Sequence, residues 1–205
     1  MKKRIFTIFL IFFVGIIFII FIKNNYKKIK FGNNESNKSV KDIEAYILNI
    51  NSYKATVEVT VNSNKNSNKY LMSQESNIKE NTSRQTIINP QNIEGVEIIS
   101  KNGDIAINNS RLNLSEIYNE YPHISENILW LDSFIDKYKN AEVKSDIYED
   151  KEYIVMEIDD KNNKYFKSRK LYLDKHTGLP KKMVAHSDDK KNEIYIIYNE
   201  IIINE

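Results

Sequence analysis

The longest hydrophobic segment of the chain runs from Ile5 to Ile22, where only Thr7 and Gly15 interrupt the large apolar residues. A helix of these 18 residues would extend about 27 Å, close to the roughly 30 Å thickness of a membrane's hydrocarbon core. A helix packed inside a globular protein seldom needs to be apolar on every face over such a length. The pattern therefore predicts a transmembrane helix.

The sequence around this segment favours an uncleaved signal anchor. Lys2, Lys3 and Arg4 precede it, no small-residue cleavage site follows it, and the chain has no cysteine to carry a lipid. A cleaved signal peptide has a shorter apolar region that ends at such a site. We therefore expect residues 1–4 in the cytoplasm, residues 5–22 across the cell membrane and the remainder outside. Basic residues lie on both flanks, so the positive-inside counts of the two sides are nearly equal. The alternative to an anchor is cleavage after the segment and release of the domain.

Two amphipathic patterns follow the polar linker 23–38 and predict helices. In residues 39–50 apolar side chains recur at helical spacing, and Ser39 with Asp42 has the form of a capping box. The second pattern covers residues 126–139, ENILWLDSFIDKYK, and its apolar arc is wider than a single interface usually requires.

Most of the remaining chain alternates between apolar and polar residues, as strands with one buried face do. The alternation is clearest in residues 52–62, where one face would carry Tyr53, Ala55, Val57 and Val59. Residues 111–124 are the exception, and we expect them to be irregular or briefly helical. Further strands are predicted at 69–79, 83–89, 95–100, 104–110, 143–149, 153–159, 165–174, 180–187 and 192–204.

The order of these elements predicts an α+β fold. Consecutive strands are joined by short turns such as Asn102-Gly103, which suits a tight hairpin because both positions tolerate a positive φ. The spacing of the turns fits one curved antiparallel sheet of eight or more strands. We expect the two helices to cover its concave face, in addition to the N-terminal transmembrane helix.

The second helix carries the candidate binding residues, Ile128, Trp130, Leu131 and Phe134. The first interpretation of this apolar arc is that it packs against the sheet as core. The second is that its aromatic side chains line a cavity or the rim of a partner-binding surface, because aromatic residues supply large apolar areas at such sites.

Charge distribution argues against nucleic-acid binding. The whole chain has a formal charge of +2, but residues 1–30 hold 7 of the 30 basic and none of the 28 acidic residues. The remainder therefore has 23 basic and 28 acidic residues, a net charge of −5. A nucleic-acid-binding domain needs a basic face.

Motifs for catalysis, cofactors or metals do not occur in the sequence. His123, His176 and His186 are scattered, and the absence of cysteine excludes the common structural zinc sites. The acidic pairs at 159–160 and 188–189 fall in predicted turns, where short polar residues are expected for backbone reasons. No nucleophile elbow or phosphate-binding glycine loop is present. We expect a non-catalytic protein without a cofactor or a metal.

Two motifs resemble the LolA/LolB-type lipoprotein-carrier fold. The first is the strand that carries Tyr53, Ala55, Val57 and Val59 after a helix, and the second is the late segment 173–183, LDKHTGLPKKM. In that fold a curved, incomplete antiparallel β-barrel encloses an apolar cavity beneath helices. The resemblance covers about residues 38–205 and implies an extracytoplasmic domain at 39–205.

Within that group, residues 89–104, NPQNIEGVEIISKNGD, look similar to clostridial proteins related to the GerS germination lipoprotein. The resemblance implies an accessory role toward a spore-cortex amidase during spore formation or germination, in the cell or spore envelope. The chain departs from that pattern because it lacks the lipidated cysteine, so residues 5–22 would replace the lipid as the membrane anchor.

Two functions from different classes follow from this resemblance. The first is a membrane-anchored accessory protein that binds a protein partner, with the cortex amidase as the candidate. The alternative is a carrier or sensor that binds the acyl chain of a lipid or lipoprotein. A carrier needs an open apolar cavity of a few hundred Å³ on the concave face, whereas an accessory protein can fill that space with side chains.

Overall fold

The structure is a computed structural model, and it describes residues 39–63, 65–109, 111–119, 127–140, 143–161, 163, 165–188 and 192–204. The predicted cytoplasmic N-terminus, membrane anchor and linker lie outside these residues. None of the helices in the described ranges has the length and hydrophobicity needed to cross a membrane. The anchor at 5–22 therefore stays a prediction.

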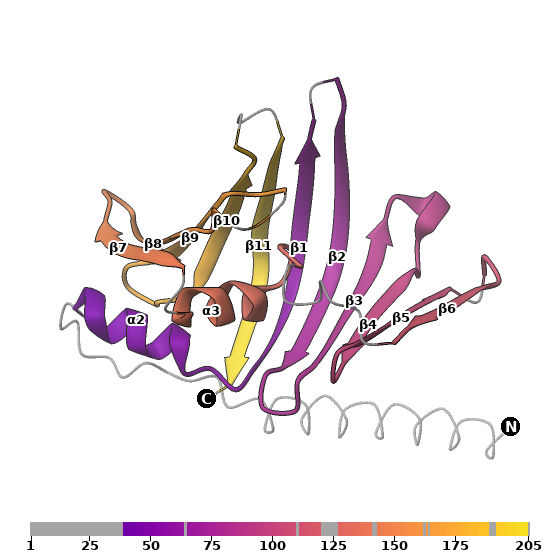
Figure 1. The fold of residues 1–205 in the computed structure, drawn as a ribbon, viewed down its shortest axis with the longest axis horizontal. Coiled ribbons are helices and arrows are strands. Elements are labelled where there is room, and N and C mark those ends of the chain that lie inside the picture. The colour runs from indigo at the N-terminus through magenta and orange to yellow at the C-terminus, as the bar shows by residue number, and fades with distance from the viewer. Residues whose placement is uncertain are drawn as a thin grey trace, which may run out of the picture. The chain divides into compact units, whose positions relative to one another are not determined.

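Eleven strands in the described residues form one open antiparallel sheet, which confirms the predicted α+β class (Figure 1). The first strand and the last strand lie side by side in its middle. The spatial order is β6 (Leu114–Tyr118), β5 (Asp104–Asn109), β4 (Glu97–Lys101), β3 (Thr82–Asn89), β2 (Ser67–Asn77), β1 (Ser52–Asn62), β11 (Glu193–Asn204), β10 (Pro180–His186), β9 (Ser168–Asp174), β8 (Tyr153–Asp159) and β7 (Lys144–Glu149).

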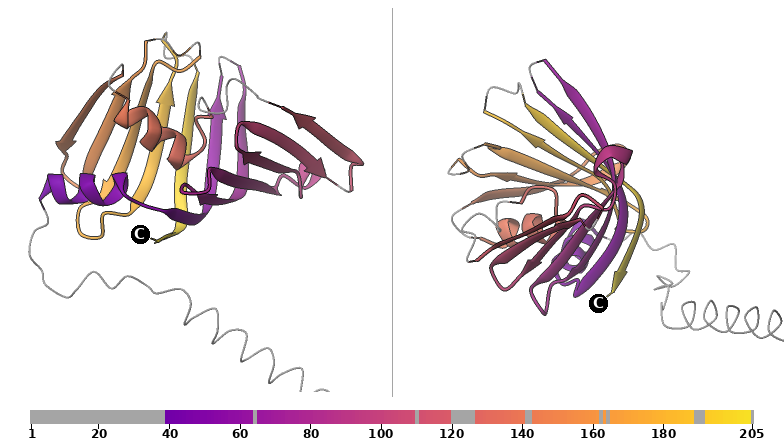
Figure 2. Two further views of the ribbon diagram at one scale, coloured as in Figure 1. Left: turned by 60° about the horizontal axis from the view of Figure 1, so that its bottom comes forward. Right: turned by 90° about the vertical axis from the view of Figure 1, so that its right-hand side faces the viewer.

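The sheet curves around its two helices, α2 (Val40–Leu48) and α3 (Leu131–Lys139), as the right-hand view of Figure 2 shows. We call the face toward the helices the inner face and the opposite one the outer face. The inward-facing residues of β1 are buried as predicted: Tyr53, Val57 and Val59 are at most 1 % exposed. They belong to one core with residues of both helices and of β8–β11.

Helix α2 begins as the sequence predicts. The Ser39 hydroxyl accepts a hydrogen bond from the Asp42 backbone N–H, and the Asp42 carboxylate accepts one from the Ser39 N–H. This reciprocal pair satisfies donors that the first turn leaves without an intrahelical partner. Ile43 and Ile47 on its buried face are at most 1 % exposed.

Helix α3 is shorter than predicted, because it begins at Leu131 instead of residue 126. Residues 128–129 form a turn in which the Asn127 side chain accepts a hydrogen bond from the Leu129 N–H over 3.1 Å. Trp130 follows with extended backbone angles. An asparagine that bonds to the backbone two residues later favours a turn over a helix.

The prediction for residues 111–124 is wrong over β6. Leu114–Tyr118 pairs with β5, from Asn109 opposite Leu114 to Ile105 opposite Tyr118. The segment is mostly exposed and lacks a regular apolar alternation. Pairing with the neighbouring strand, which local sequence does not reveal, therefore makes it a strand.

Candidate functional site

Helix α3 and the turn before it place the four candidate residues against the inner face. Trp130 is 3 % exposed, and Leu131 and Phe134 are fully buried. Ile128 is partly buried and packs against the same core. This packing agrees with the interpretation of the arc as core, and a role of the four residues in ligand or partner binding stays a prediction.

The N-terminal end of α3 is attached to the inner face by neutral hydrogen bonds. The Leu131 N–H donates to the Tyr53 hydroxyl over 3.2 Å, and the Trp130 indole N–H donates to Gln85 Oε1 over 3.2 Å. Gln74 Nε2 donates to the Leu129 carbonyl over 3.0 Å. These contacts satisfy polar groups that would otherwise be buried unpaired, so they fix where the helix begins on the sheet.

A carboxylate on α3 meets two serines of the sheet. Ser76 on β2 and Ser83 on β3 lie opposite each other and both donate to Asp132 Oδ2, over 2.8 and 2.6 Å. Hydrogen bonds to a carboxylate are shorter and stronger than those between neutral groups. Asp132 also lies in the first turn of the helix, where a negative charge interacts favourably with the helix dipole.

A buried arginine ties the other side of α3 to β9. Arg169 is 3 % exposed and donates to the hydroxyl and the carbonyl of Ser133, over 3.2 and 3.4 Å. Its guanidinium lies 5.8 Å from the centre of the Phe134 ring. Burial lowers the pKa of Arg169 to about 10, although the nearby Asp160 carboxylate opposes this shift.

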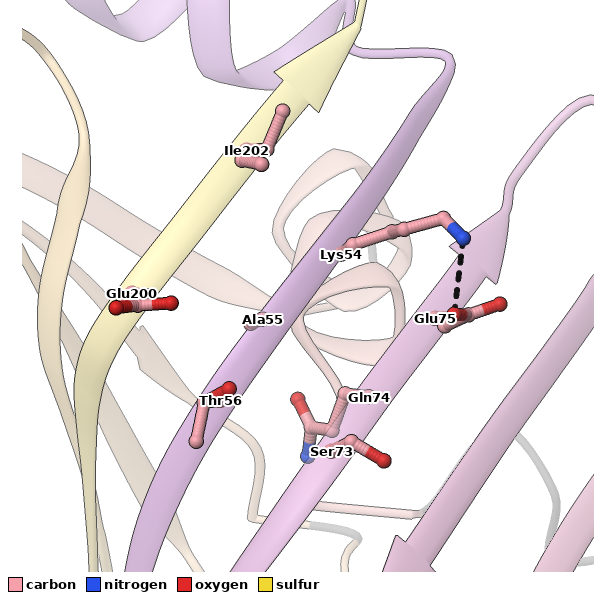
Figure 3. Close-up of a pocket in the computed structure, with 8 residues that line it drawn as sticks. All are labelled: Lys54, Ala55, Thr56, Ser73, Gln74, Glu75, Glu200 and Ile202. Carbon is pink, nitrogen blue, oxygen red and sulfur yellow. Dashed lines mark hydrogen bonds and ion pairs between the residues drawn. The ribbon is translucent and has the colours of Figure 1, made fainter. Parts of the chain in front are cut away.

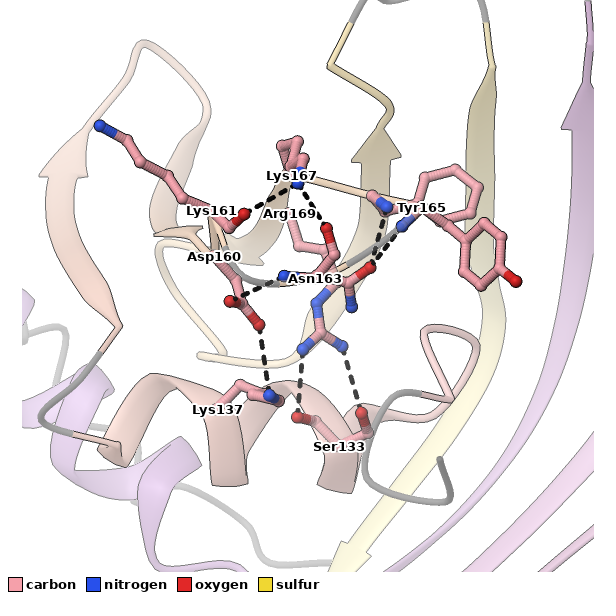
Figure 4. A network of polar contacts seen from close by, with 9 residues as sticks. Ser133, Lys137, Asp160, Lys161, Asn163, Tyr165, Lys167 and Arg169 are labelled. Carbon is pink, nitrogen blue, oxygen red and sulfur yellow. Dashed lines mark hydrogen bonds and ion pairs between the residues drawn. The ribbon is translucent and has the colours of Figure 1, made fainter. Parts of the chain in front are cut away.

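Asp160, after β8, extends this network to the next turn of α3 (Figure 4). Its carboxylate is 3.2 Å from the Lys137 ammonium and accepts a hydrogen bond from the Asn163 N–H. Asn163 in turn accepts hydrogen bonds from the N–H groups of Tyr165 and Phe166. These contacts fix the conformation of the connection between β8 and β9 and attach it to α3.

Two buried tyrosines lie beneath the same helix. Burial, together with the Asp132 charge, raises the pKa of Tyr53 and of Tyr198 well above the ordinary value. The Tyr198 hydroxyl has no hydrogen-bond partner among the described residues. Both phenols therefore stay protonated at neutral pH, and neither is placed to act as a base.

The histidines that the structure describes lie apart from this network. His176 is in the turn between β9 and β10, and His186 on β10 is 3.0 Å from the Glu193 carboxylate. His123 lies outside the described residues. Within the described part of the chain, no three His, Cys, Asp or Glu side chains are grouped so that they could hold a metal ion.

Sequence reasoning missed the polar residues that hold α3. Gln74 and Ser76 on β2, and Ser83 and Gln85 on β3, occupy inward positions of alternating strands, and all four are at most 7 % exposed. A polar residue at an inward position indicates a buried hydrogen bond. The alternation thus contained the signal, but it did not identify Asp132 and Trp130 as the partners.

The outer face carries a separate shallow depression, with a volume of about 200 Å³, at the bulge between Thr56 and Val57 (Figure 3). Lys54 and Glu75 form an ion pair of 2.9 Å at its edge. The side chains of Thr56, Ser73, Glu200 and Ile202 also line it. Its mixed polar lining differs from the apolar cavity that an acyl chain requires.

Comparison with family models and with curated proteins gives no match. Comparison with solved structures gives several matches. An uncharacterized conserved protein from Thermus thermophilus is 12 % identical, with a TM-score of 0.51 over 82 % of this chain and 89 % of that chain. The chain therefore shares a known fold.

Members of the LolA superfamily are among these structural neighbours. One is NE2245 from Nitrosomonas europaea, at 12 % identity and a TM-score of 0.43 over 82 % of this chain and 94 % of that chain. Another neighbour is the GerS lipoprotein complex with the CwlD amidase from Clostridioides difficile. That match has 22 % identity and a TM-score of 0.45 over 80 % of this chain and 90 % of that chain. The predicted resemblance is confirmed, and at these identities it concerns the fold.

Proposed function

We propose that this protein is a non-catalytic, membrane-anchored binding protein of the cell envelope that holds a protein partner. The partner that we propose first is a spore-cortex amidase of the CwlD kind, because the GerS lipoprotein, a structural neighbour, is in complex with that amidase. The observation that carries the binding role is the packing of α3 on the inner face, where polar contacts fix the helix on both sides.

The packing of α3 on the inner face favours a partner-binding protein over a carrier. Trp130, Leu131, Phe134 and Ile135 are at most 3 % exposed, so they occupy the centre of the face where an acyl chain would lie. Opening this space would break the contacts of Asp132 as well as displace the apolar side chains. Buried hydrogen bonds to a charged group are costly to leave unmade.

Binding of the purified full-length chain, in detergent, to a purified CwlD-type amidase tests the proposal. We expect a saturable complex of defined stoichiometry, measured by calorimetry and by light scattering after size exclusion. Amidase activity on cortex fragments should depend on the complex and be absent from this chain alone. Failure of the amidase to bind would refute this choice of partner.

Trp130 provides the matched test of the carrier alternative, because it is the only tryptophan of the chain. Its indole is buried beside α3, so its emission reports on that site directly. We expect fatty acids and phospholipids to leave the emission unchanged, and the protein to be purified without a stoichiometric lipid. A lipid bound one to one that shifts the Trp130 emission would favour the carrier.

A further inference from the structure

The outer face of β7–β11 carries a row of side chains that does not look like a solvated surface. Direct neighbours across five strands form this row: Tyr148, Val155, Tyr172, Lys182 and Ile197. Ile197 pairs in turn with Glu58 of β1. Since Glu58 lies between the inward-pointing Val57 and Val59, the whole row belongs to the outer face.

Tyrosines on this face cover two buried valines. Val155 and Val184 are 1 % and 3 % exposed although they point away from the main core. Tyr153 and Tyr172 meet edge to face with ring centres 5.8 Å apart, and the Lys182 ammonium lies 4.1 Å from the centre of the Tyr172 ring. The face therefore has a packed aromatic layer, whereas solvated sheet faces are mainly polar.

Exposed isoleucines continue this layer along β11. Ile197 is 38 % exposed beside Lys182, and Ile202 is 44 % exposed at the depression on the outer face. Large apolar side chains grouped with tyrosine are typical of the centre of a protein interface. We call Tyr172, Lys182, Ile197, Glu200 and Ile202 the outer patch.

The outer patch carries charges of both signs that have no opposite charge within ion-pair distance among the described residues. The Lys182 ammonium lies over the Tyr172 ring, and Glu200 lines the depression, where the nearby Lys54 is paired with Glu75. Neighbouring charges are paired, as in Lys170 with Glu157 at 3.0 Å. Two uncompensated charges beside apolar side chains define a complementary partner surface.

We propose that the outer patch is the docking surface for the protein partner. This inference rests on the proposed function and deepens it by naming the surface. The partner presents an apolar side chain to Ile197 and Ile202, a carboxylate to Lys182 and a cation to Glu200. A protein fits this pattern better than an anionic membrane surface, which the Glu200 carboxylate would repel.

Substitutions in the outer patch of the full-length chain test the proposal against the CwlD-type amidase. We expect Lys182→Glu and Ile197→Asp each to weaken binding at least tenfold. The matched controls are Lys101→Glu on the outer face of β4 and Ile88→Asp on β3, where Ile88 is 41 % exposed. The controls should stay within twofold of the wild type. Unchanged Trp130 emission and melting temperature would confirm that every variant is folded.

A wrong docking surface and a wrong choice of partner would give different experimental results. If the amidase binds the wild type and both patch variants equally, the outer patch is wrong and the proposed partner stands. If the amidase does not bind the wild type, a photo-crosslinking residue at position 197, compared with one at position 88, identifies the protein that contacts this face in cells.

That protein is then purified and bound to the full-length chain. A tenfold loss of its affinity with Lys182→Glu would support the docking surface with a different partner. Crosslinks from position 88 alone, or none from either position, would overturn it. Binding to vesicles of phosphatidylglycerol and phosphatidylcholine that Lys182→Glu abolishes would also overturn it, in favour of a membrane contact.

Discussion

Ser83 on β3 donates its hydroxyl hydrogen to the carboxylate of Asp132 on α3 over 2.6 Å, across 49 positions of the chain. Ser76 on β2 donates to the same oxygen. This contact joins the two halves of the fold, because β2 and β3 lie on one side of the central strands and α3 also contacts β9 on the other. The helix is therefore fixed at two separate places.

Substitution of Asp132 tests how firmly α3 is held. Asp132→Asn removes the charge that strengthens both serine hydrogen bonds, and we expect the free energy of unfolding to fall by roughly 1–3 kcal/mol. Urea unfolding monitored by Trp130 emission measures the loss. The control is Asp136→Asn, one turn later on the exposed side of α3, which should be nearly neutral. Equal stabilities of the two variants would show that the serine contacts do not hold the helix.

The buried charges on the other side of α3 predict a strong coupling between Asp160 and Arg169. Asp160→Asn leaves Arg169 and Lys137 without the carboxylate, and we expect a loss of about 3 kcal/mol because uncompensated buried charges are costly. Arg169→Met should cost less, because it removes a desolvated charge and retains volume.

The double substitution Asp160→Asn with Arg169→Met measures this coupling. Its loss of stability should be smaller than the sum of the two single losses, by at least about 1 kcal/mol in a double-mutant cycle. Strict additivity would mean that the two charges act independently.

Sequence alone predicted the sheet and the placement of its inner face well, because alternation depends on which residues face the core. Tyr53, Val57 and Val59 are buried as expected. The strand at Leu114–Tyr118 was missed because its five residues pair along one edge with β5 only. Strand pairing is a non-local property that local sequence does not reveal.

Prediction of the site was less complete for a related reason. The apolar arc is buried, although Ile128 and Trp130 lie in the turn before α3. Its polar anchors come from strands distant in sequence, as with Gln85 and Trp130, which are 45 positions apart. The outer patch could not be predicted from the sequence either. Tyr172, Lys182 and Ile197 become neighbours only through the pairing register of three strands.

The turn at Gly178, within the late motif of the sequence, has a backbone conformation that a side chain would strain. Gly178 has a φ of +71°, and a Cβ there would lie 3.4 Å from Tyr46 and 3.6 Å from Ile43 on α2. We expect Gly178→Ala to lower the free energy of unfolding by about 1–2 kcal/mol from backbone strain alone, because a Cβ at these distances makes ordinary van der Waals contacts with α2. Thermal unfolding of the variant checks this.

A second glycine with a positive φ tests whether backbone strain alone accounts for the loss. Gly103 has a φ of +97°, and a Cβ there would meet nothing within 4 Å beyond the adjoining residues, so Gly103→Ala reports backbone strain alone. The two variants should lose similar stability, and a Gly178→Ala variant clearly less stable than Gly103→Ala would contradict this ordinary contact with α2.

The buried tyrosines predict that the protein loses stability in alkali. Burial and the Asp132 charge raise the pKa of Tyr53 and of Tyr198 in the folded state, so their contribution is fully present below the ordinary pKa of about 10 and declines as the pH rises above it. Arg169, whose pKa is lowered to about 10 by burial, acts in the opposite direction over the same range. Because two phenols oppose one guanidinium, the net effect of these three groups is a loss of stability as the pH rises above 10.

The variant Tyr198→Phe isolates one of these phenols. Its hydroxyl has no hydrogen-bond partner among the described residues, so we expect the variant to be as stable as the wild type at pH 7 and to lose less stability between pH 10 and 11. Guanidinium unfolding at each pH gives the slopes, and absorbance at 295 nm counts the ionised tyrosines. Ionisation of every tyrosine near pH 10 in a protein that is still folded would contradict the burial of Tyr53 and Tyr198.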